Sequence, residues 1–288
     1  MEVKNIAVIG AGVMGSQIAQ VAAQAGFEVR MRDISDELVQ RALDGIRGSL
    51  KRFFVDKGKM TAEEAEEIMG HIQGTTDLAA AVKEADLAIE SIPENMALKK
   101  EMFQDLSDLC RAETILASNT SALSITDIAS ASTRPERVIG MHFFNPVAVM
   151  KLVEIVRGAK TDEETVATVK EVAEKRLGKE TVVINDSPGF ITSRMVDVII
   201  NEAACMLEEG VASAEEIDKA IKLGLGHPMG PLELADFTNG VAIAMEGMTY
   251  LQQEFGDPKY RPSYLLKQMV RAGHLGRKVG RGFYEYST

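Results

Sequence analysis

The hydrophobic residues in the first part of the chain form short β-branched runs that alternate with helical patterns. An apolar run rich in branched side chains, as expected of a strand that is buried on both faces, is formed by Val3, Ile6, Ala7, Val8 and Ile9. Apolar residues then recur at helical spacing over 18–25, and Gly26 is a typical residue to end such a helix. Residues 27–32 return to a strand pattern. This order predicts a strand–helix–strand unit at the start of the chain.

The alternation of strand and helix patterns continues to residue 184. The predicted strands are 74–76, 86–90, 114–117, 138–144, 152–156 and 181–184, and the predicted helices are 78–83, 96–110, 126–130 and 163–177. Two further helical patterns, at about 36–55 and 62–72, interrupt the alternation, so we expect them to project from the sheet as an arm. The order predicts an α/β fold with a Rossmann-like, doubly wound and mostly parallel sheet.

The pattern changes at the polar segment 185–189, and beyond it the chain is predicted to be helical. The predicted elements there are helices over 190–209, 214–223, 231–254 and 262–272 and a short final strand over 282–284. The first of these helices carries an apolar stripe of the kind found in a core or a dimer interface. We therefore place a domain boundary near residue 185, with an α/β domain over 1–185 (arm at about 36–72) and an all-α domain over 186–288.

The composition of the 288-residue chain is ordinary for two domains, 45% hydrophobic and 26% charged, but its net charge is −11. That charge argues against a nucleic-acid partner and against an anionic membrane surface. Cys110 and Cys205 lack metal-binding or redox spacing, which favours a reducing cytoplasm and gives no support for a metal site. The first strand pattern begins at residue 3, and no apolar run is long enough to span a bilayer. Neither a signal peptide nor a membrane segment is expected.

A glycine-rich turn, Gly10-Ala11-Gly12-Val13-Met14-Gly15, separates the first strand from the first helix. Between a strand and a helix this spacing is typical of a dinucleotide site, although an ordinary turn with no ligand is the alternative. Gly10 permits the tight turn, Gly12 lets the backbone approach a pyrophosphate, and Gly15 lets helix and strand pack closely. The helix N-terminus then faces the phosphate charge.

An acidic residue, Asp33, follows the second strand 18 residues after Gly15. Its carboxylate would accept hydrogen bonds from an adenosine ribose and repel a 2′-phosphate, which favours NAD. Arg32 could instead bind that phosphate. Because side chains alternate along a strand, Arg32 is expected to point away from Asp33, and NAD is the predicted cofactor.

A histidine and a carboxylate lie in two neighbouring apolar strands. His142 is near the end of one strand and Glu154 lies inside the next, where a buried carboxylate needs a partner. In a hairpin centred on Ala148 the two residues stand opposite one another, about 5 Å apart at Cβ. A carboxylate that holds one ring nitrogen makes the other a better general base. The alternative is a purely structural pair.

Two further groups have both a functional and an ordinary interpretation. Ser118-Asn119-Thr120-Ser121 follows a strand, where small hydroxyl residues can bind a substrate carbonyl or a cofactor amide, or simply cap the next helix. Lys51, Arg52, Lys57 and Lys59 gather in the arm, either as a solvated face or as an anion clamp on an acidic protein.

Several motifs resemble the L-3-hydroxyacyl-CoA dehydrogenases, in unbroken order from residue 3 to the end of the chain. They are Gly10–Gly15, Ser118–Ser121, His142-Phe143-Phe144-Asn145-Pro146, Lys151–Glu154, Asp186-Ser187-Pro188-Gly189-Phe190, Gly226-His227-Pro228-Met229-Gly230-Pro231 and Gly280–Tyr284. The segment Phe255–Pro262 looks most like the bacterial short-chain branch that acts on 3-hydroxybutyryl-CoA.

The resemblance implies reversible, NAD-dependent oxidation of (S)-3-hydroxyacyl-CoA, of short chain such as 3-hydroxybutyryl-CoA, to 3-oxoacyl-CoA. It implies that His142 is the catalytic base and Glu154 its partner. Ser121 would contact the substrate oxygen and the nicotinamide, and Asn145 would line the cofactor pocket. The resemblance also implies a homodimer formed through the helical domain, which would contribute to the substrate cleft.

Other matching positions extend the implied site. Glu94 and Lys99 match cofactor-contacting positions, and Ser49 on the arm matches a coenzyme A contact. The chain departs from the family pattern at two places. Ser193 stands where an asparagine of the catalytic site is common, and Asp56 stands where some relatives place a CoA-binding lysine, so Lys51, Arg52 or Lys57 would have to supply that charge.

Two other functions remain open from the residues. One is a dehydrogenase of a non-CoA hydroxy acid or sugar acid, since the dinucleotide half would look the same. The other is a protein that binds NAD(H) without turnover, although such a protein needs no base like His142.

Overall fold

Two units make up the chain in the computed structural model, which describes residues 1–286. The first unit is Met1–Asp186, and the second begins at Ser187. Each has its own hydrophobic core. No helix in residues 1–286 is long and apolar enough to cross a membrane.

The first unit is built on an eight-stranded sheet with the strand order β3-β2-β1-β4-β5-β6-β7-β8. The strands are β1 (Asn5–Ile9), β2 (Glu28–Arg32), β3 (Ile72–Thr75), β4 (Leu87–Glu90), β5 (Ile115–Ser118), β6 (Val138–Phe143), β7 (Leu152–Arg157) and β8 (Glu180–Asn185). All neighbouring strands are parallel except β6 and β7, which form an antiparallel hairpin. The predicted doubly wound, mostly parallel sheet is confirmed.

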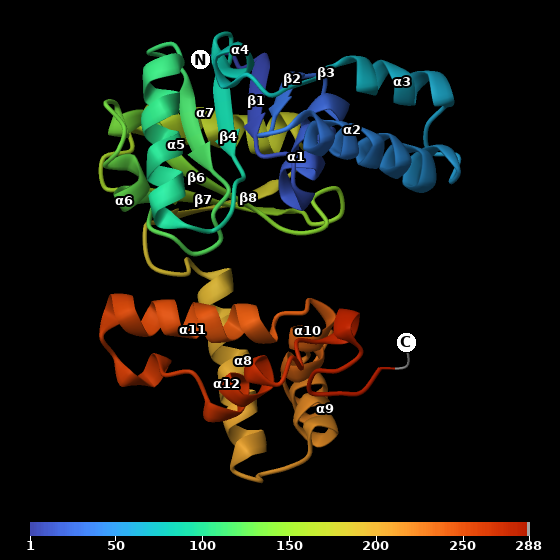
Figure 1. Ribbon diagram of the computed structural model, residues 1–288, viewed down its shortest axis with the longest axis vertical. Helices are drawn as coiled ribbons and strands as arrows, with labels where there is room; N and C mark the ends of the chain where they lie inside the picture. Colours follow the sequence, from blue (N-terminus) through green and yellow to red (C-terminus); the bar gives the residue numbers. More distant parts are fainter. Residues whose placement is uncertain (287–288) are drawn as a thin grey trace. The chain divides into compact units, whose positions relative to one another are not determined.

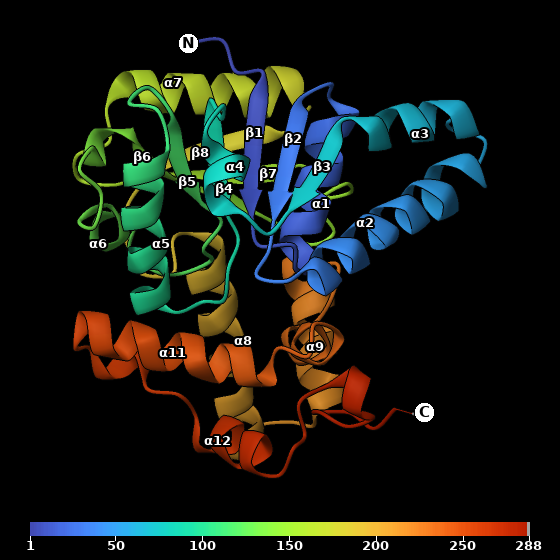
Figure 2. The same ribbon diagram turned by 45° about the horizontal axis from the view of Figure 1, so that its top comes forward.

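Helices cover both faces of this sheet (Figure 1), with α5 on the near side and α7 behind it in Figure 2. The helices of the first unit are α1 (Val13–Gln24), α2 (Asp36–Leu50), α3 (Ala62–Gly70), α4 (Leu78–Val82), α5 (Met96–Leu109), α6 (Ile125–Ala129) and α7 (Glu163–Glu171). Double coverage explains why β4, β5 and β6 are buried at every position and read as continuous apolar runs.

The chain order reverses between β1 and β4, which are adjacent in the sheet although β2 and β3 lie between them in sequence. Ligands of open α/β sheets bind outside the carboxyl ends of the strands at such a switch point. The turn after β1 and the turn after β4 touch there, because a Cβ atom on Gly10 would lie 2.4 Å from the carbonyl oxygen of Ser91.

The expected arm is present and extends past the edge strand β3 (Figure 2). The helix predicted over 36–55 is α2 followed by a π-helical segment, Lys51–Val55. The helix predicted over 62–72 ends earlier, at Gly70, because the chain joins β3 at Ile72. Arg47 of α2 and Glu66 of α3 form an ion pair of 3.4 Å, which links the two helices.

The second unit consists of helices packed around α8 (Thr192–Glu208). The others are α9 (Ala214–Leu225), α10 (Pro231–Phe237), α11 (Val241–Phe255) and α12 (Tyr264–Arg271). The single helix predicted over 231–254 was wrong, because the chain breaks between α10 and α11. Asn239 has a left-handed backbone there, with φ of 52°, and its side-chain oxygen accepts the N–H of Lys278 at 2.7 Å.

The strand predicted over 282–284 was also wrong. This segment forms no regular strand in the described part of the chain, only isolated bridges that pair Arg281 with Gly276 and Glu285. A buried carboxylate takes the place of a neighbouring strand: Asp236 accepts the N–H groups of Phe283 and Tyr284 at 2.9 and 2.8 Å. The backbone donors are satisfied, so no sheet is needed.

Candidate active site

The glycine-rich turn has the shape that a dinucleotide needs. Gly10 has φ of 105°, a conformation that favours glycine. A Cβ atom on Gly15 would lie 1.8 Å from the carbonyl oxygen of Gly10, so only glycine lets α1 pack this closely on the turn. Gly12 caps α1 without a side-chain bond and faces open space. The turn therefore leaves backbone free to meet a phosphate.

Asp33 faces the same turn. Its Oδ2 accepts the N–H of Ala11 at 2.7 Å and its Oδ1 accepts the N–H of Ile34 at 2.6 Å. Each carboxylate oxygen keeps capacity for another donor, such as a ribose hydroxyl. The guanidinium of Arg32 has its partner elsewhere: its Nε–H donates to the carbonyl oxygen of Thr76 at 3.2 Å. These residues fit a bound NAD.

The hairpin of β6 and β7 brings the predicted histidine and carboxylate together. His142 pairs with Glu154 in the register, and its Nδ1 lies 2.8 Å from Glu154 Oε2. The two residues are only 6% and 1% exposed. In such surroundings a carboxylate holds the ring in one orientation and stabilises a proton that the ring accepts. The Phe144 ring lies 4.3 Å from the imidazole and further restricts it.

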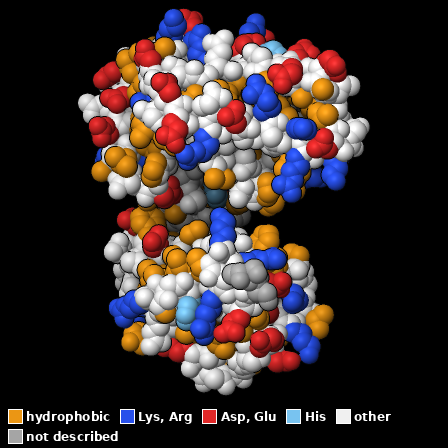
Figure 3. All heavy atoms as spheres, turned by 45° about the vertical axis from the view of Figure 1, so that its right-hand side comes forward, with side chains coloured by type: hydrophobic (Ala, Val, Ile, Leu, Met, Phe, Trp, Pro, Cys, Tyr) orange, Lys and Arg blue, Asp and Glu red, His pale blue; other side chains and the backbone are white. Residues whose placement is uncertain are grey.

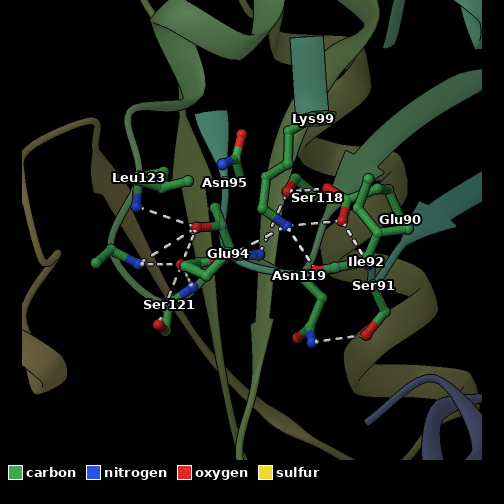
Figure 4. A network of polar contacts seen from close by, with 12 residues as sticks. Glu90, Ser91, Ile92, Glu94, Asn95, Lys99, Ser118, Asn119, Ser121 and Leu123 are labelled. Carbon is green, nitrogen blue, oxygen red and sulfur yellow. Dashed lines mark hydrogen bonds and ion pairs between the residues drawn. The ribbon is translucent and has the colours of Figure 1, made fainter. Parts of the chain in front are cut away.

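A second buried carboxylate ends strand β4, which β5 separates from the hairpin (Figure 4). Glu90 is fully buried and accepts hydrogen bonds from Lys99 Nζ at 2.7 Å and from Ser118 Oγ at 2.6 Å. The Lys99 ammonium, 1% exposed, also contacts the carbonyl of Ile92 at 3.2 Å and Glu94 Oε2 at 3.4 Å. Lys99 thus ties the turn after β4 to α5, beneath the edge where a ligand would bind.

Glu94 organises the loop that follows β5. Its Oε1 accepts the N–H of Ser121 at 2.9 Å, the Ser121 hydroxyl at 3.2 Å and the Thr120 hydroxyl at 2.5 Å (Figure 4). Asn119 in the same loop accepts the N–H of Phe143 at 2.9 Å, one residue after His142. Glu94 therefore fixes Ser121, and Asn119 links the same loop to the hairpin that carries the imidazole.

Asn145 lies in the exposed loop after β6, where its Oδ1 accepts a hydrogen bond from Gln17 Nε2 at 2.9 Å. The sheet edge thus gathers the glycine-rich turn, Asp33, Glu94, Ser121, His142 and Asn145 at the carboxyl ends of β1, β2, β4, β5 and β6. The described residues contain no group of three or more His, Cys, Asp or Glu side chains that could hold a metal ion.

The arm holds the residues expected to meet coenzyme A. Ser49 is half-buried on the last turn of α2, and Lys51, Arg52 and Lys57 are exposed beyond it. Within residues 1–286 none of these three cations forms an ion pair, whereas Arg47 on the same helix pairs with Glu66. Asp56 is exposed beside them. Ser193 belongs to the second unit, in the first turn of α8.

Two residues that contact the site, Glu90 and Gln17, are not among those predicted from the sequence. Glu90 carries the same signal as Glu154, a carboxylate in an apolar strand, and that signal could have identified it. Gln17 gives no signal at all in the sequence, because its contacts with Asn145 and Val147 bridge about 130 residues.

Comparison with known proteins agrees with this geometry. Residues 5–187 match the model of the 3-hydroxyacyl-CoA dehydrogenase NAD binding domain, and residues 189–286 match that of the 3-hydroxyacyl-CoA dehydrogenase C-terminal domain. A probable 3-hydroxybutyryl-CoA dehydrogenase of Bacillus subtilis is 51% identical over 286 residues, which cover 99% of this chain and 98% of the relative.

Two further relatives are similar over their full length. The 3-hydroxybutyryl-CoA dehydrogenase of Clostridioides difficile is 46% identical and covers 98% of this chain, with 99% of the relative aligned. The crystal structure of (S)-3-hydroxybutyryl-CoA dehydrogenase from Ralstonia eutropha is 44% identical, with a TM-score of 0.95 and complete coverage of both chains. The chain therefore belongs to the 3-hydroxyacyl-CoA dehydrogenase family, and its cofactor is NAD.

Proposed function

We propose that this enzyme reversibly oxidises short-chain (S)-3-hydroxyacyl-CoA, such as 3-hydroxybutyryl-CoA, to 3-oxoacyl-CoA, with His142 as the catalytic base. The observation that carries the proposal is the buried His142–Glu154 pair at the same sheet edge as the glycine-rich turn. A protein that only binds NAD(H) has no use for a base there. The relatives named as 3-hydroxybutyryl-CoA dehydrogenases, 46–51% identical, support the short chain.

Each residue of the site has a different role in the proposed reaction. Bound NAD supplies the hydride chemistry, and the protein supplies alignment and the base. His142 takes the hydroxyl proton at Nε2, because Nδ1 is bonded to Glu154, which stabilises the charge that develops on the ring. Ser121 offers its hydroxyl to the substrate oxygen, and Glu94 keeps that side chain in place. We propose Ser193 as a further contact, shorter than the usual asparagine and acting through a water.

We propose that the cofactor is bound by the same residues that the sequence predicted. The turn Gly10–Gly15 meets the pyrophosphate, Asp33 the ribose, and Glu94 and Asn145 the nicotinamide end. We retain Lys99 in this group, and its buried Nζ supports a role exerted through Glu94, 3.4 Å away.

The test of the proposed function is NADH oxidation with acetoacetyl-CoA set against longer 3-oxoacyl-CoAs and against free acetoacetate. We expect kcat/KM to be highest for acetoacetyl-CoA and free acetoacetate to be a poor substrate. A comparable rate with free acetoacetate would show that the enzyme acts on a hydroxy acid without coenzyme A. Binding of NADH without turnover of any of these compounds would show a non-catalytic protein.

We also propose that the arm binds the phosphates of coenzyme A through Ser49, Lys51, Arg52 and Lys57. Cations without acidic partners are available to a phosphate ligand, and the protein is otherwise acidic. The double substitution Lys51→Glu and Arg52→Glu should raise KM for acetoacetyl-CoA about tenfold or more and leave KM for NADH nearly unchanged. The matched control, Lys170→Glu and Lys175→Glu, makes the same charge change at exposed residues outside the arm. Equal effects of the two double variants on this KM would show that the arm cations form only a solvated surface and do not bind coenzyme A.

The proposed assembly is a homodimer formed through the second unit, in the cytoplasm. Large hydrophobic side chains are exposed on that unit, among them Met195, Leu223, Leu225, Phe237 and Ile243. Figure 3 shows hydrophobic side chains scattered among charged ones on the molecular surface. Exposed apolar side chains in such number favour an interface. Both cysteines are free, which supports a reducing compartment. Light scattering should give the mass of two chains, and the mass of one chain would contradict the dimer.

A further inference from the structure

The loop of residues 144–151 joins the two strands that carry His142 and Glu154, and it contains Asn145. Most of the loop is exposed, including Val149 and Met150. Val147 is the exception, since it is 1% exposed and packs into the hydrophobic core of the first unit. The position of Asn145, two residues before it, therefore depends on how Val147 is held.

Side chains from two other elements bind the main chain of Val147. Gln17 of α1 accepts its N–H with Oε1 at 2.8 Å, and Lys179, which precedes β8, donates to its carbonyl. The Lys179 ammonium also binds the carbonyl of Met150 at 2.9 Å. Lys179 is only 8% exposed and forms no ion pair within residues 1–286, so burial lowers its pKa. A buried cation is thus used to hold this loop.

These hydrogen bonds fix the orientation of the Gln17 amide and, through it, that of the Asn145 amide. A backbone N–H can only donate, so the oxygen of the Gln17 amide must face Val147. The Gln17 nitrogen must then face Asn145, which has to present its oxygen, as the distance of 2.9 Å from Nε2 to Oδ1 shows. The nitrogen of the Asn145 amide is left as a donor, and it forms no hydrogen bond within residues 1–286.

We propose that Gln17 is a positioning residue for the nicotinamide, because it holds Asn145 so that Nδ2 donates to the carboxamide oxygen of the bound cofactor. Gln17 lies one helical turn after Val13, the first residue of the helix that follows the glycine-rich turn. The helix that meets the pyrophosphate thus also sets the amide at the nicotinamide end of the cofactor. This inference rests on the proposed place of Asn145 in the cofactor pocket.

The proposal predicts what happens when the Gln17 donor is removed. In Gln17→Glu, one carboxylate oxygen still accepts the N–H of Val147, but the other now faces Asn145 as an acceptor. Asn145 must reverse its amide and present Oδ1 to the cofactor. A nicotinamide carboxamide can rotate and donate its NH₂ to that oxygen, whereas the acetyl group of the 3-acetylpyridine analogue has no donor.

The experiment compares Kd values for NADH and for the reduced 3-acetylpyridine analogue by calorimetry. In Gln17→Glu the ratio of the analogue's Kd to that of NADH should rise about tenfold over the wild-type ratio, the effect of one hydrogen bond. Gln24→Glu makes the same charge change at the end of the same helix and should keep the wild-type ratio. A purely structural brace, or the added charge alone, weakens both ligands equally. An unchanged ratio in Gln17→Glu would overturn the proposal.

A second variant covers the case in which Gln17→Glu does not fold. Gln17→Met removes both hydrogen bonds and should raise the Kd for NADH at least threefold, because the loop and the Asn145 amide are no longer fixed. Wild-type affinity in Gln17→Met would also overturn the proposal. Turnover of 3-hydroxybutyryl-CoA by the wild type is measured on the same preparation. A shifted Kd ratio without turnover would contradict the proposed activity and leave the positioning role intact.

Discussion

Two buried carboxylates lie in the same sheet, with the strands β5 and β6 between the strands that carry them, and they differ in their partner. Glu154 in β7 contacts the His142 imidazole at 2.8 Å, and Glu90 at the end of β4 contacts the Lys99 ammonium at 2.7 Å. Both carboxylates are at most 1% exposed. An imidazole can gain and lose a proton near neutral pH, whereas an ammonium paired with a carboxylate stays charged.

In each pair, the partner decides what the buried carboxylate does. Beside His142, in the function we propose, the carboxylate stabilises the proton that the imidazole accepts and so supports chemistry. Beside Lys99 it anchors a fixed ion pair, on which Ser118 and the turn after β4 are built. We therefore expect substitutions in the first pair to change the rate and substitutions in the second to change the stability.

The largest expected effect is at the imidazole. His142→Gln should lower kcat by roughly 10²–10⁴-fold, because general-base catalysis contributes in that range. NADH affinity should stay nearly intact, since the glycine-rich turn and Asp33 are unchanged. Steady-state kinetics and a binding titration on the same protein check both parts. Full activity in His142→Gln would falsify the proposed mechanism.

The next largest effect is expected at the ion pair. Glu90→Gln should lower the free energy of unfolding by roughly 3 kcal/mol, because it leaves the Lys99 ammonium buried with only Glu94 as a counter-charge. Denaturant unfolding measures this change. The matched variant Glu154→Gln leaves an imidazole, not a buried ammonium, beside the new amide and should cost clearly less stability. A larger loss of unfolding free energy in Glu154→Gln than in Glu90→Gln would contradict this expectation.

A third buried carboxylate extends the comparison into the second unit. Asp197 of α8 is 7% exposed and forms no hydrogen bond or ion pair within the described residues. It packs against α11, where a Cβ atom on Gly247 would lie 2.0 Å from its Oδ2. With no partner to favour the charged form, burial raises the pKa of Asp197 to about 7.

Because the pKa of Asp197 is raised in the folded state, its contribution to the free energy of unfolding decreases as the pH rises. The folded state binds the proton more tightly than the unfolded chain, so this contribution is present below about pH 4 and is lost as the pH rises to about 7. Asp197→Asn should therefore flatten the stability profile between these pH values. At pH 8 it should stabilise by on the order of 2 kcal/mol, less than the full ionisation penalty because the amide is buried too. Melting temperatures across this range test it, and a less stable Asp197→Asn protein at pH 8 would contradict it.

Much of the fold and part of the site could be predicted from local patterns in the sequence. The register of His142 opposite Glu154 followed from counting equal residues on either side of Ala148, because hairpin pairing is nearly local. The glycine-rich turn followed from its place between a strand and a helix. The break between α10 and α11 was missed although Asn239 and Gly240 mark a turn, because apolar spacing continues on both sides of it.

What the sequence could not supply are contacts between distant segments. The carboxylate of Asp236 replaces a strand for Phe283 and Tyr284, which no pattern around residues 282–284 indicates. The same holds for Gln17, whose two contacts with the loop of residues 144–151 become visible only when α1 and that loop lie side by side. Such side-chain to backbone bonds depend on tertiary structure, and a single sequence carries no periodic signal for them.

The roles of the two carboxylates are tested most directly by the pH profile of kcat/KM for 3-hydroxybutyryl-CoA oxidation, measured from about pH 6 to about pH 9 in three proteins. The wild type and Glu90→Gln should share one profile, because the Lys99 pair takes no part in proton transfer. Glu154→Gln should show a lower rate and a rising limb displaced to lower pH, because an imidazole without its carboxylate is a weaker base. A wild-type profile in Glu154→Gln, or the same displacement in Glu90→Gln, would contradict the claim that the partner decides the role of the carboxylate.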